Sequence, residues 1–414
     1  MIDPCSLEPK RLLSLEEALA IINNRIQAVD ATEQLSLKNA LGRVLAADLY
    51  APINIPYARN SAMDGYAFAS KGINLHQPFT LQLIGTSWAG KPYPGSLNAG
   101  ECIRIFTGAV VPDEADSVCI QEQVIADGEK ITFPANVAVQ QNIREAGEEF
   151  SAGERLCAKH KILSPADLGL IAAAGIKDVP VYRQLHIAFF TTGDELLTLG
   201  QPPETGKIYD SNRYTLAGFL ADPCYKVSDL GIIPDQKQVL EEQLLHAAET
   251  HDVIISTGGA SVGDADYINE VLAQCGEVSF WKIAIKPGKP LAFGKIKECY
   301  FFGLPGNPVS ATVTFQQVVS PALRQLSGAA AGKPMRLWAT CTTALKKSAG
   351  RQEFQRGILS QSADRQLIVA STGSQGSHIL SSMSRANCYI ILPIDSKGIQ
   401  AGEQVLVEPF SIFL

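Results

Sequence analysis

Two turns rich in glycine and hydroxyl groups each follow a short apolar run that predicts a β-strand. The turn TTGDEL at residues 191–196 follows the run at 187–190, and STGGASVGDADY at 256–267 follows the run at 253–255. Open α/β sheets bind ligands at the carboxyl ends of their strands, where free N–H groups attract anions. Together the turns predict a phosphate or nucleotide site, with Asp264 or Asp266 on Mg²⁺. Each turn alone could equally be an ordinary strand-to-helix connection.

Three lysines surround the Pro-Gly turn of the segment IKPGKP. Lys282 and Lys286 are an even number of residues apart, so on one continuous strand their side chains would share a face, and Lys289 follows the turn. A cationic cluster suits a multiply anionic ligand. The alternative is a solvated edge strand protected by lysines, and the spacing alone favours that alternative.

Two further segments contain residues that could serve a site. LPGNPVS at 304–310 leads from a predicted strand into a long predicted helix, and its two prolines restrict the backbone. NSAMDGYA at 60–67 contains Asp64, which could end a turn or present a carboxylate to another domain. The spacing does not decide between these alternatives.

Composition excludes several classes of protein. The chain has 414 residues, a net charge of −7 and nine cysteines, none of them in a C-x-x-C pair, so neither a disulfide framework nor a zinc site is expected. The acidic balance argues against nucleic acid as a partner. No apolar run is long enough to span a membrane, and the start of the chain does not resemble a signal peptide, so a cytoplasmic location without membrane contact is expected.

The pattern of apolar, polar and turn-forming residues changes three times along the chain. A capping box at Ser14 predicts a helix over 15–26, and residues 51–149 predict short strands at 79–84, 102–106, 117–124 and 137–143. From residue 185, strands and helices alternate, which predicts a parallel sheet covered on both faces. After Gly332 the pattern predicts strands without helices.

Taken in order, seven segments resemble the MoeA family of molybdopterin molybdenumtransferases, which is related to the E domain of gephyrin. They are NSAMDGYA, RIFTGA, NIREAGE, TTGDEL, STGGASVGDADY, IKPGKP and LPGNPVS. The resemblance implies a multidomain α/β and all-β fold, with a three-layer αβα molybdopterin-binding domain, a β insertion domain and a C-terminal β-barrel. The implied limits are 1–50 with 147–182 for a discontinuous N-terminal domain, 51–146 for the insertion, 183–330 and 331–414.

The resemblance also implies a reaction. Molybdate is inserted into adenylylated molybdopterin, with Mg²⁺-dependent release of AMP, to give Mo-molybdopterin. The family acts as a homodimer, and a molybdopterin adenylyltransferase and molybdoenzymes are possible partners. The alternatives are an adenylyltransferase acting one step earlier and a non-catalytic, gephyrin-like scaffold.

The resemblance assigns provisional roles to residues of this chain. The expected catalytic residues are Asp64, Glu195, Asp235, Asp266, Lys282 and Lys286. The expected metal ligands are Asp194, Glu195, Asp235 and Asp266. The expected cofactor-binding residues are Thr107, Arg144, Thr192, Gly193, Asp194, Ser256, Gly258, Gly259, Ser261, Lys289, Pro305, Pro308 and Ser377. Ala58-Arg59 departs from the family pattern of an aromatic followed by an acidic residue, and Glu149 stands where Asp is commoner.

Overall fold

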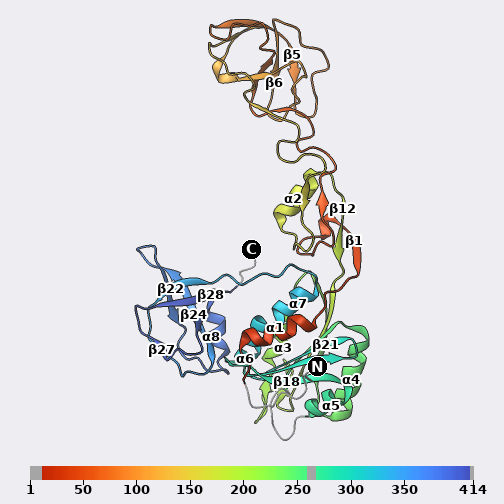
Figure 1. Ribbon diagram of the computed structural model, residues 1–414, viewed down its shortest axis with the longest axis vertical. Coiled ribbons are helices and arrows are strands. Elements are labelled where there is room, and N and C mark those ends of the chain that lie inside the picture. The colour runs from red at the N-terminus through yellow and green to blue at the C-terminus, as the bar shows by residue number, and fades with distance from the viewer. Residues whose placement is uncertain (1–11, 259–266, 411–414) are drawn as a thin grey trace.

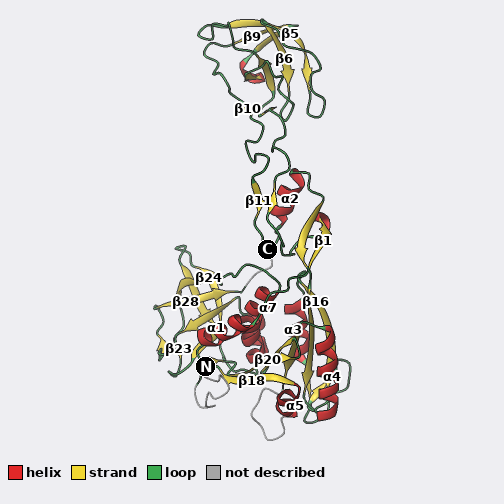
Figure 2. Ribbon diagram, turned by 45° about the vertical axis from the view of Figure 1, so that its right-hand side comes forward, coloured by secondary structure: helices red, strands yellow, loops and turns green. Residues whose placement is uncertain are grey.

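The computed structural model describes residues 12–258 and 267–410 and is elongated (Figure 1). A sheet containing β5 and β6 forms one end, and a sheet flanked by helices forms the other, with a second all-β part beside it. A narrow region with α2, β1 and β12 connects the two ends. Figure 2 shows that most helices gather around the lower sheet. Within the described residues, no helix combines the length and apolarity needed to cross a membrane.

The α/β part contains a six-stranded sheet with the order β16-β13-β17-β21-β20-β18. β20 runs in the direction opposite to the other five strands, which corrects the expectation of a wholly parallel sheet. The turn between β20 and β21 is two residues long, and so short a connection can join only antiparallel strands. The strands are β13 (Leu185–Thr192), β16 (Tyr225–Ile233), β17 (Val253–Thr257), β18 (Gly276–Lys282), β20 (Pro290–Ile296) and β21 (Cys299–Leu304).

Helices cover both faces of this sheet, each with its own apolar core. One face carries α3, α6, α7 and the π-helical turn η4, and the other carries α4 and α5. Their bounds are α3 (Ser211–Leu220), α4 (Lys237–Thr250), α5 (Tyr267–Cys275), α6 (Pro308–Thr314), η4 (Phe315–Val319) and α7 (Ser320–Leu326). The short strands β14 (Leu196–Leu197) and β15 (Ile208–Tyr209) pair beside the sheet.

The first helix, α1 (Leu15–Arg25), begins with the predicted capping box. Ser14 N–H donates to Glu17 Oε2 at 2.8 Å, and Glu17 N–H donates to Ser14 Oγ at 3.1 Å. Its apolar face packs against α7 and η4 in the core of the α/β part. The helix therefore packs with the α/β part, although the resemblance groups residues 1–50 with 147–182 in one domain.

The connecting region is built from short paired segments. β1 (Thr32–Ser36) pairs with β12 (Asp178–Tyr182), and β2 (Leu49–Tyr50) pairs with β11 (Arg155–Cys157). The 3₁₀ turn η2 (Leu37–Asn39) and α2 (Pro165–Ala173) pack on them, and Ser164 caps α2 as predicted. Because the chain passes through this region twice, the inserted sheet lies between its outgoing and returning strands.

The inserted part is a six-stranded sheet with the order β7-β4-β6-β5-β9-β8. Only the last residue of the strand predicted at 137–143 lies in a strand, because Gln140 and Asn142 have positive φ angles and break an extended chain. The sheet strands are β4 (Gly65–Phe68), β5 (Phe79–Ser87), β6 (Glu101–Ile105), β7 (Ser117–Ile120), β8 (Ile125–Asp127) and β9 (Lys130–Phe133). Outside the sheet are the pair β3 (Asn60–Ser61) and β10 (Ile143–Arg144), and the 3₁₀ turn η3 (Gln121–Gln123).

The C-terminal part closes into a barrel, because β24 pairs with β26 as well as with β25. The short strand β19 (Ile285–Lys286) joins this sheet from the α/β part. The helix α8 (Leu380–Arg385) corrects the expectation that helices stop after Gly332. The remaining strands are β22 (Leu337–Cys341), β23 (Leu345–Lys346), β24 (Gln352–Gln361), β25 (Leu367–Ser371), β26 (Cys388–Leu392), β27 (Gly398–Ile399) and β28 (Gln404–Pro409).

Candidate functional site

The carboxyl ends of β13, β17 and β21 meet at one edge of the α/β sheet. Thr192 ends β13 and Ser256 lies near the end of β17, with exposures of 6% and 0%. Thr192 Oγ1 and Ser256 Oγ have no hydrogen-bond partner among the described residues. A buried hydroxyl left in this state costs about 1–3 kcal/mol. These two hydroxyls are therefore available for hydrogen bonds to a ligand or to residues outside the described part of the chain.

Backbones approach closely at this edge because glycines occupy the contact points. Gly258 has a φ of +88°, and a Cβ atom there would lie 2.3 Å from the carbonyl oxygen of Thr192. A Cβ atom on Gly306 would lie 3.9 Å from Gly258 Cα, so the turns after β17 and β21 are neighbours. The structure thus brings Thr192, Ser256 and Gly258 together in one place.

Three carboxylates lie next to this edge. Burial raises the pKa of Asp235, and the nearby charges of Asp194 and Glu195 raise it further. The Glu195 carboxylate also folds back over Gly193, where a Cβ atom would lie 2.4 Å from Glu195 Oε2. Among the described residues, no group of three or more His, Cys, Asp or Glu side chains could hold a metal ion. Mg²⁺ sites often combine one or two carboxylates with phosphate oxygens of the substrate, and this donor set fits that pattern.

The three lysines occupy one turn but not one strand, which corrects the prediction of a continuous strand. Lys282 ends β18 in the α/β sheet, whereas Lys286 belongs to β19 and pairs with the barrel. Ile283 N–H donates to the Lys289 carbonyl at 2.7 Å, which brings the two sides of the turn together. All three lysines are exposed.

The start of α6 adjoins a loop of the barrel. Pro308 is the first residue of the helix, and the N–H of Val309 donates to the carbonyl of Ser377 at 3.0 Å. Pro305 is buried in the turn that precedes the helix. Ser377 therefore lies beside Pro308.

Asp64, Thr107 and Arg144 belong to the inserted part at the other end of the molecule (Figure 1). Asp64 Oδ1 accepts hydrogen bonds from the Thr107 N–H and hydroxyl, both at 2.8 Å. The backbone N–H of Thr107 is the main cause that lowers the pKa of Asp64. Arg144 lies on β10, paired with Asn60. Within one chain these residues are separated from the edge of the α/β sheet.

The remaining predicted site residues, Gly259, Ser261 and Asp266, lie outside the described residues, as does Asp264.

Three family models match successive parts of the chain. They are the MoeA N-terminal region (domain I and II) at residues 13–175, a probable molybdopterin binding domain at 188–325, and the MoeA C-terminal region (domain IV) at 339–410. A molybdopterin molybdenumtransferase of Haemophilus influenzae is 42% identical over 405 residues, covering 97% of this chain and 100% of that protein. The chain belongs to the MoeA family.

Two further comparisons agree with this membership. A molybdopterin molybdenumtransferase of Nostoc is 33% identical over 95% of this chain and 93% of that protein. The crystal structure of the molybdopterin biosynthesis moeA protein from Pyrococcus horikoshii matches with a TM-score of 0.84 and 30% identity, over 97% of this chain and 100% of that one.

Two polar residues of this MoeA-family chain that the motifs did not include contact the turn at Gly306 and the loop before Ser377. Asn212 Nδ2 donates to the Gly306 carbonyl at 2.7 Å, while its buried Oδ1 has no partner among the described residues. Arg356 is 1% exposed and donates to Ser382 Oγ at 3.0 Å and to the Gly376 carbonyl at 3.2 Å. The strand that contains Arg356 has the largely polar sequence QEFQRGILSQ, so the sequence offered no signal that this charge is buried.

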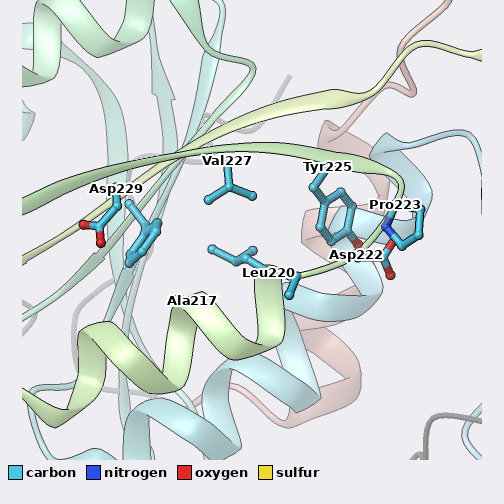
Figure 3. A pocket seen from close by; sticks show the side chains of 9 residues that line it. Ala217, Leu220, Asp222, Pro223, Tyr225, Val227 and Asp229 are labelled. Atoms are coloured by element: carbon cyan, nitrogen blue, oxygen red, sulfur yellow. The ribbon is translucent and has the colours of Figure 1, made fainter.

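A cavity of about 510 Å³ in the MoeA-family chain lies away from this edge, between α3 and β16 (Figure 3). Its lining is largely apolar and includes Leu220, Tyr225 and Val227. The carboxylate of Asp229 at its margin is paired with Arg213 at 2.8 Å. None of the predicted site residues lines it, so the cavity is not part of the candidate site.

Proposed function

We propose that the chain is a molybdopterin molybdenumtransferase that inserts molybdate into adenylylated molybdopterin, with Mg²⁺-dependent release of AMP, giving Mo-molybdopterin. The observation that carries this proposal is the pair of buried hydroxyls of Thr192 and Ser256, which have no partner in the described ranges 12–258 and 267–410, at the strand edge of a MoeA-family domain. The adenylyltransferase and scaffold alternatives are not favoured, since relatives named for the transfer reaction align with nearly the whole chain.

The strand edge supplies the phosphate contacts in this proposal. Thr192, Gly193, Ser256 and Gly258, together with Gly259 and Ser261, would cradle the pterin phosphate and the adenylate. The two unpartnered hydroxyls would donate to phosphate oxygens, and the glycines leave room for the ligand to approach the backbone.

The carboxylates act on the phosphoanhydride bond. Asp194, Glu195 and Asp235, with Asp266, would hold Mg²⁺, which when bound would neutralise charge that develops on the phosphate oxygens. Hydrolysis needs a metal or a base near the phosphorus, and these carboxylates are the candidates for activating the attacking water. Cleavage of the bond then frees AMP.

The lysine turn serves the other substrate. Lys282, Lys286 and Lys289 would attract the molybdate dianion, since exposed ammonium groups raise the local concentration of an anion. Pro305, Pro308 and Ser377 would form the wall of the molybdate pocket.

A second copy of the chain would complete the site. Asp64, Thr107 and Arg144 lie at the far end of the same chain, so they reach the strand edge only if a partner subunit supplies them. We therefore propose a homodimer in which the inserted part of each chain faces the strand edge of the other. We retain the domain limits given above, a cytoplasmic location and handover from an adenylyltransferase to molybdoenzymes as proposals.

The test is AMP release from adenylylated molybdopterin with Mg²⁺, measured with and without molybdate. Molybdate-dependent AMP supports the insertase. Consumption of ATP with molybdopterin would instead establish the adenylyltransferase, and binding of the pterin without AMP release would contradict the proposed reaction.

A further inference from the structure

The turn with the three lysines is held by two parts of the molecule. After Lys282 the chain leaves the α/β sheet, pairs with β24 of the barrel as β19, and returns as β20. Lys286 lies opposite Glu353 in this parallel pairing, and the Gln352 N–H donates to the Ala284 carbonyl at 2.8 Å. The barrel therefore determines the path of the turn.

Glu353 is a buried carboxylate with one ammonium partner. The residue is 3% exposed, and its Oε1 accepts a hydrogen bond from Lys286 Nζ at 3.0 Å. Its Oε2 accepts from Gln355 Nε2 at 3.0 Å, so both oxygens are engaged. A buried carboxylate is stable as an ion only with such partners. The Lys286 side chain is 47% exposed, which leaves its ammonium open to an anion from solvent.

The neighbouring lysines differ from Lys286. The charge of Lys347 also acts near Glu353, but its Nζ donates to the carbonyls of Ser348, Ile394 and Ser396. Within the described part of the chain, the side chains of Lys282 and Lys289 form no hydrogen bond or ion pair. Of the three lysines in the turn, Lys286 is thus the one held in place.

We propose that Glu353 is a positioning residue for molybdate capture, a role that rests on the proposed function. Its carboxylate fixes the position of the Lys286 ammonium in the lysine turn, so the molybdate dianion binds to a cation that is already oriented. The ammonium has three hydrogens, and the bond to Glu353 leaves two for oxyanion contacts. The barrel contributes to anion binding through this carboxylate without touching the anion.

The kinetic test compares Glu353→Gln with Glu408→Gln. Glu408 is a matched control because it is a buried barrel glutamate that accepts from Arg336 at 3.0 Å and from Gln317 at 2.6 Å, away from the lysine turn. In molybdate-dependent AMP release, Glu353→Gln should raise the molybdate KM about tenfold with little change in kcat, the size of one lost charged contact. Glu408→Gln should lower the thermal midpoint but leave that KM unchanged.

A double-mutant cycle separates positioning from a structural role. In a Lys286→Gln background, Glu353→Gln should have no further effect on the molybdate KM, because the group that it positions is gone. Additive effects, or equal KM values for Glu353→Gln and Glu408→Gln, would overturn the proposal. Glu353→Asp keeps the charge and should give an intermediate KM if the glutamine variant fails to fold.

A second measurement does not depend on activity. Under trace acetylation followed by mass spectrometry, Lys286 should react more slowly than Lys289, which has no described side-chain partner, and Glu353→Gln should raise the relative rate of Lys286 severalfold. An unchanged rate would show that the pair does not hold the lysine in solution. If the wild type releases no AMP with molybdate, the proposed function fails. If it does, and the KM of Glu353→Gln is normal, only the positioning role fails.

Discussion

At the carboxyl edge of the α/β sheet, the hydroxyls of Thr192 and Ser256 are buried without a partner among the described residues. In the inserted β part, by contrast, the Asp64 carboxylate already accepts two hydrogen bonds from Thr107. The first region has hydrogen-bonding capacity that a ligand can use, and the second presents a charge whose orientation is set before any ligand arrives. In the proposed site, the hydroxyls without a described partner would therefore bind the ligand, and the Asp64 carboxylate would supply a charge in a fixed orientation.

The largest effect is expected for Gly258→Ala at the strand edge. The new Cβ atom would lie 2.3 Å from the Thr192 carbonyl oxygen, so the backbone must move and AMP release should be lost. The positive φ adds a cost of about 1–2 kcal/mol. Gly206→Ala is the matched control, with a φ of +86° and open space around its Cβ position. If the two variants have equal activity and equal unfolding free energy, the close approach at the edge is unimportant.

The second prediction concerns the inserted part. Asp64→Asn should lower AMP release by about 10- to 100-fold, because it removes a charge from the reacting centre, while the thermal midpoint falls no further than in the control below. Asp116→Asn is the control from the same part, since Asp116 accepts from the Ser70 N–H and hydroxyl at 2.9 and 2.7 Å in a purely structural contact. It should reduce stability and spare activity.

Mixing variants sharpens the comparison between the two ends of the molecule. Suppose that each site of a homodimer is built from both chains. Mixing subunits that carry only Asp64→Asn with subunits that carry only Asp235→Asn, and allowing the subunits to exchange, should then restore activity. Random pairing would give about a quarter of the wild-type activity, because half of the dimers contain one intact site. Activity no greater than the sum of the two variants would contradict the shared site.

The third prediction compares adjacent threonines. Thr192→Val should raise the substrate KM about tenfold without loss of stability, because its hydroxyl has no described partner to lose. Thr191→Val should cost about 1–3 kcal/mol of unfolding free energy, since Thr191 Oγ1 donates to the buried Asp210 Oδ2 at 2.5 Å. Urea denaturation and AMP kinetics on both variants provide the test. A destabilised Thr192→Val would show that its hydroxyl has a structural partner.

The smallest effect is a dependence of stability on pH. The pKa of Asp235 is raised in the folded state, so its charged form opposes folding at neutral pH, and this cost falls as pH drops through the raised pKa. Asp235→Asn should therefore slightly raise the urea midpoint at pH 7 and remove this part of the pH dependence.

For Asp252, the expected dependence of stability on pH has the opposite sign to that of Asp235. Burial opposes its ionisation, but hydrogen bonds from Arg183 and from the His186 N–H outweigh burial and lower its pKa. Its stabilisation is present above the ordinary carboxyl pKa and is lost as pH falls through the lowered value. Asp252→Asn should lower the urea midpoint at pH 7. Shifts in the same direction for both variants would contradict these assignments.

The sequence alone determined the local features of this protein, because they depend on neighbouring residues. The capping box at Ser14 specified the start of α1, and the apolar runs before the turns at 191–196 and 256–267 specified β13 and β17. The ordered motifs were enough to predict the MoeA family, which the comparisons confirm.

Only the tertiary structure decided which of these features meet. It packs α1 against α7 and places Lys286 in the barrel sheet, whereas a strand continuous with Lys282 was predicted. It also places the inserted sheet, which begins with β4 directly after Asp64, at the opposite end of the molecule from the α/β sheet. It also paired Lys286 with Glu353, a contact between residues 67 positions apart. Such contacts follow from burial of apolar faces and pairing of strands distant in sequence, and the spacing of residues along a chain does not encode them locally.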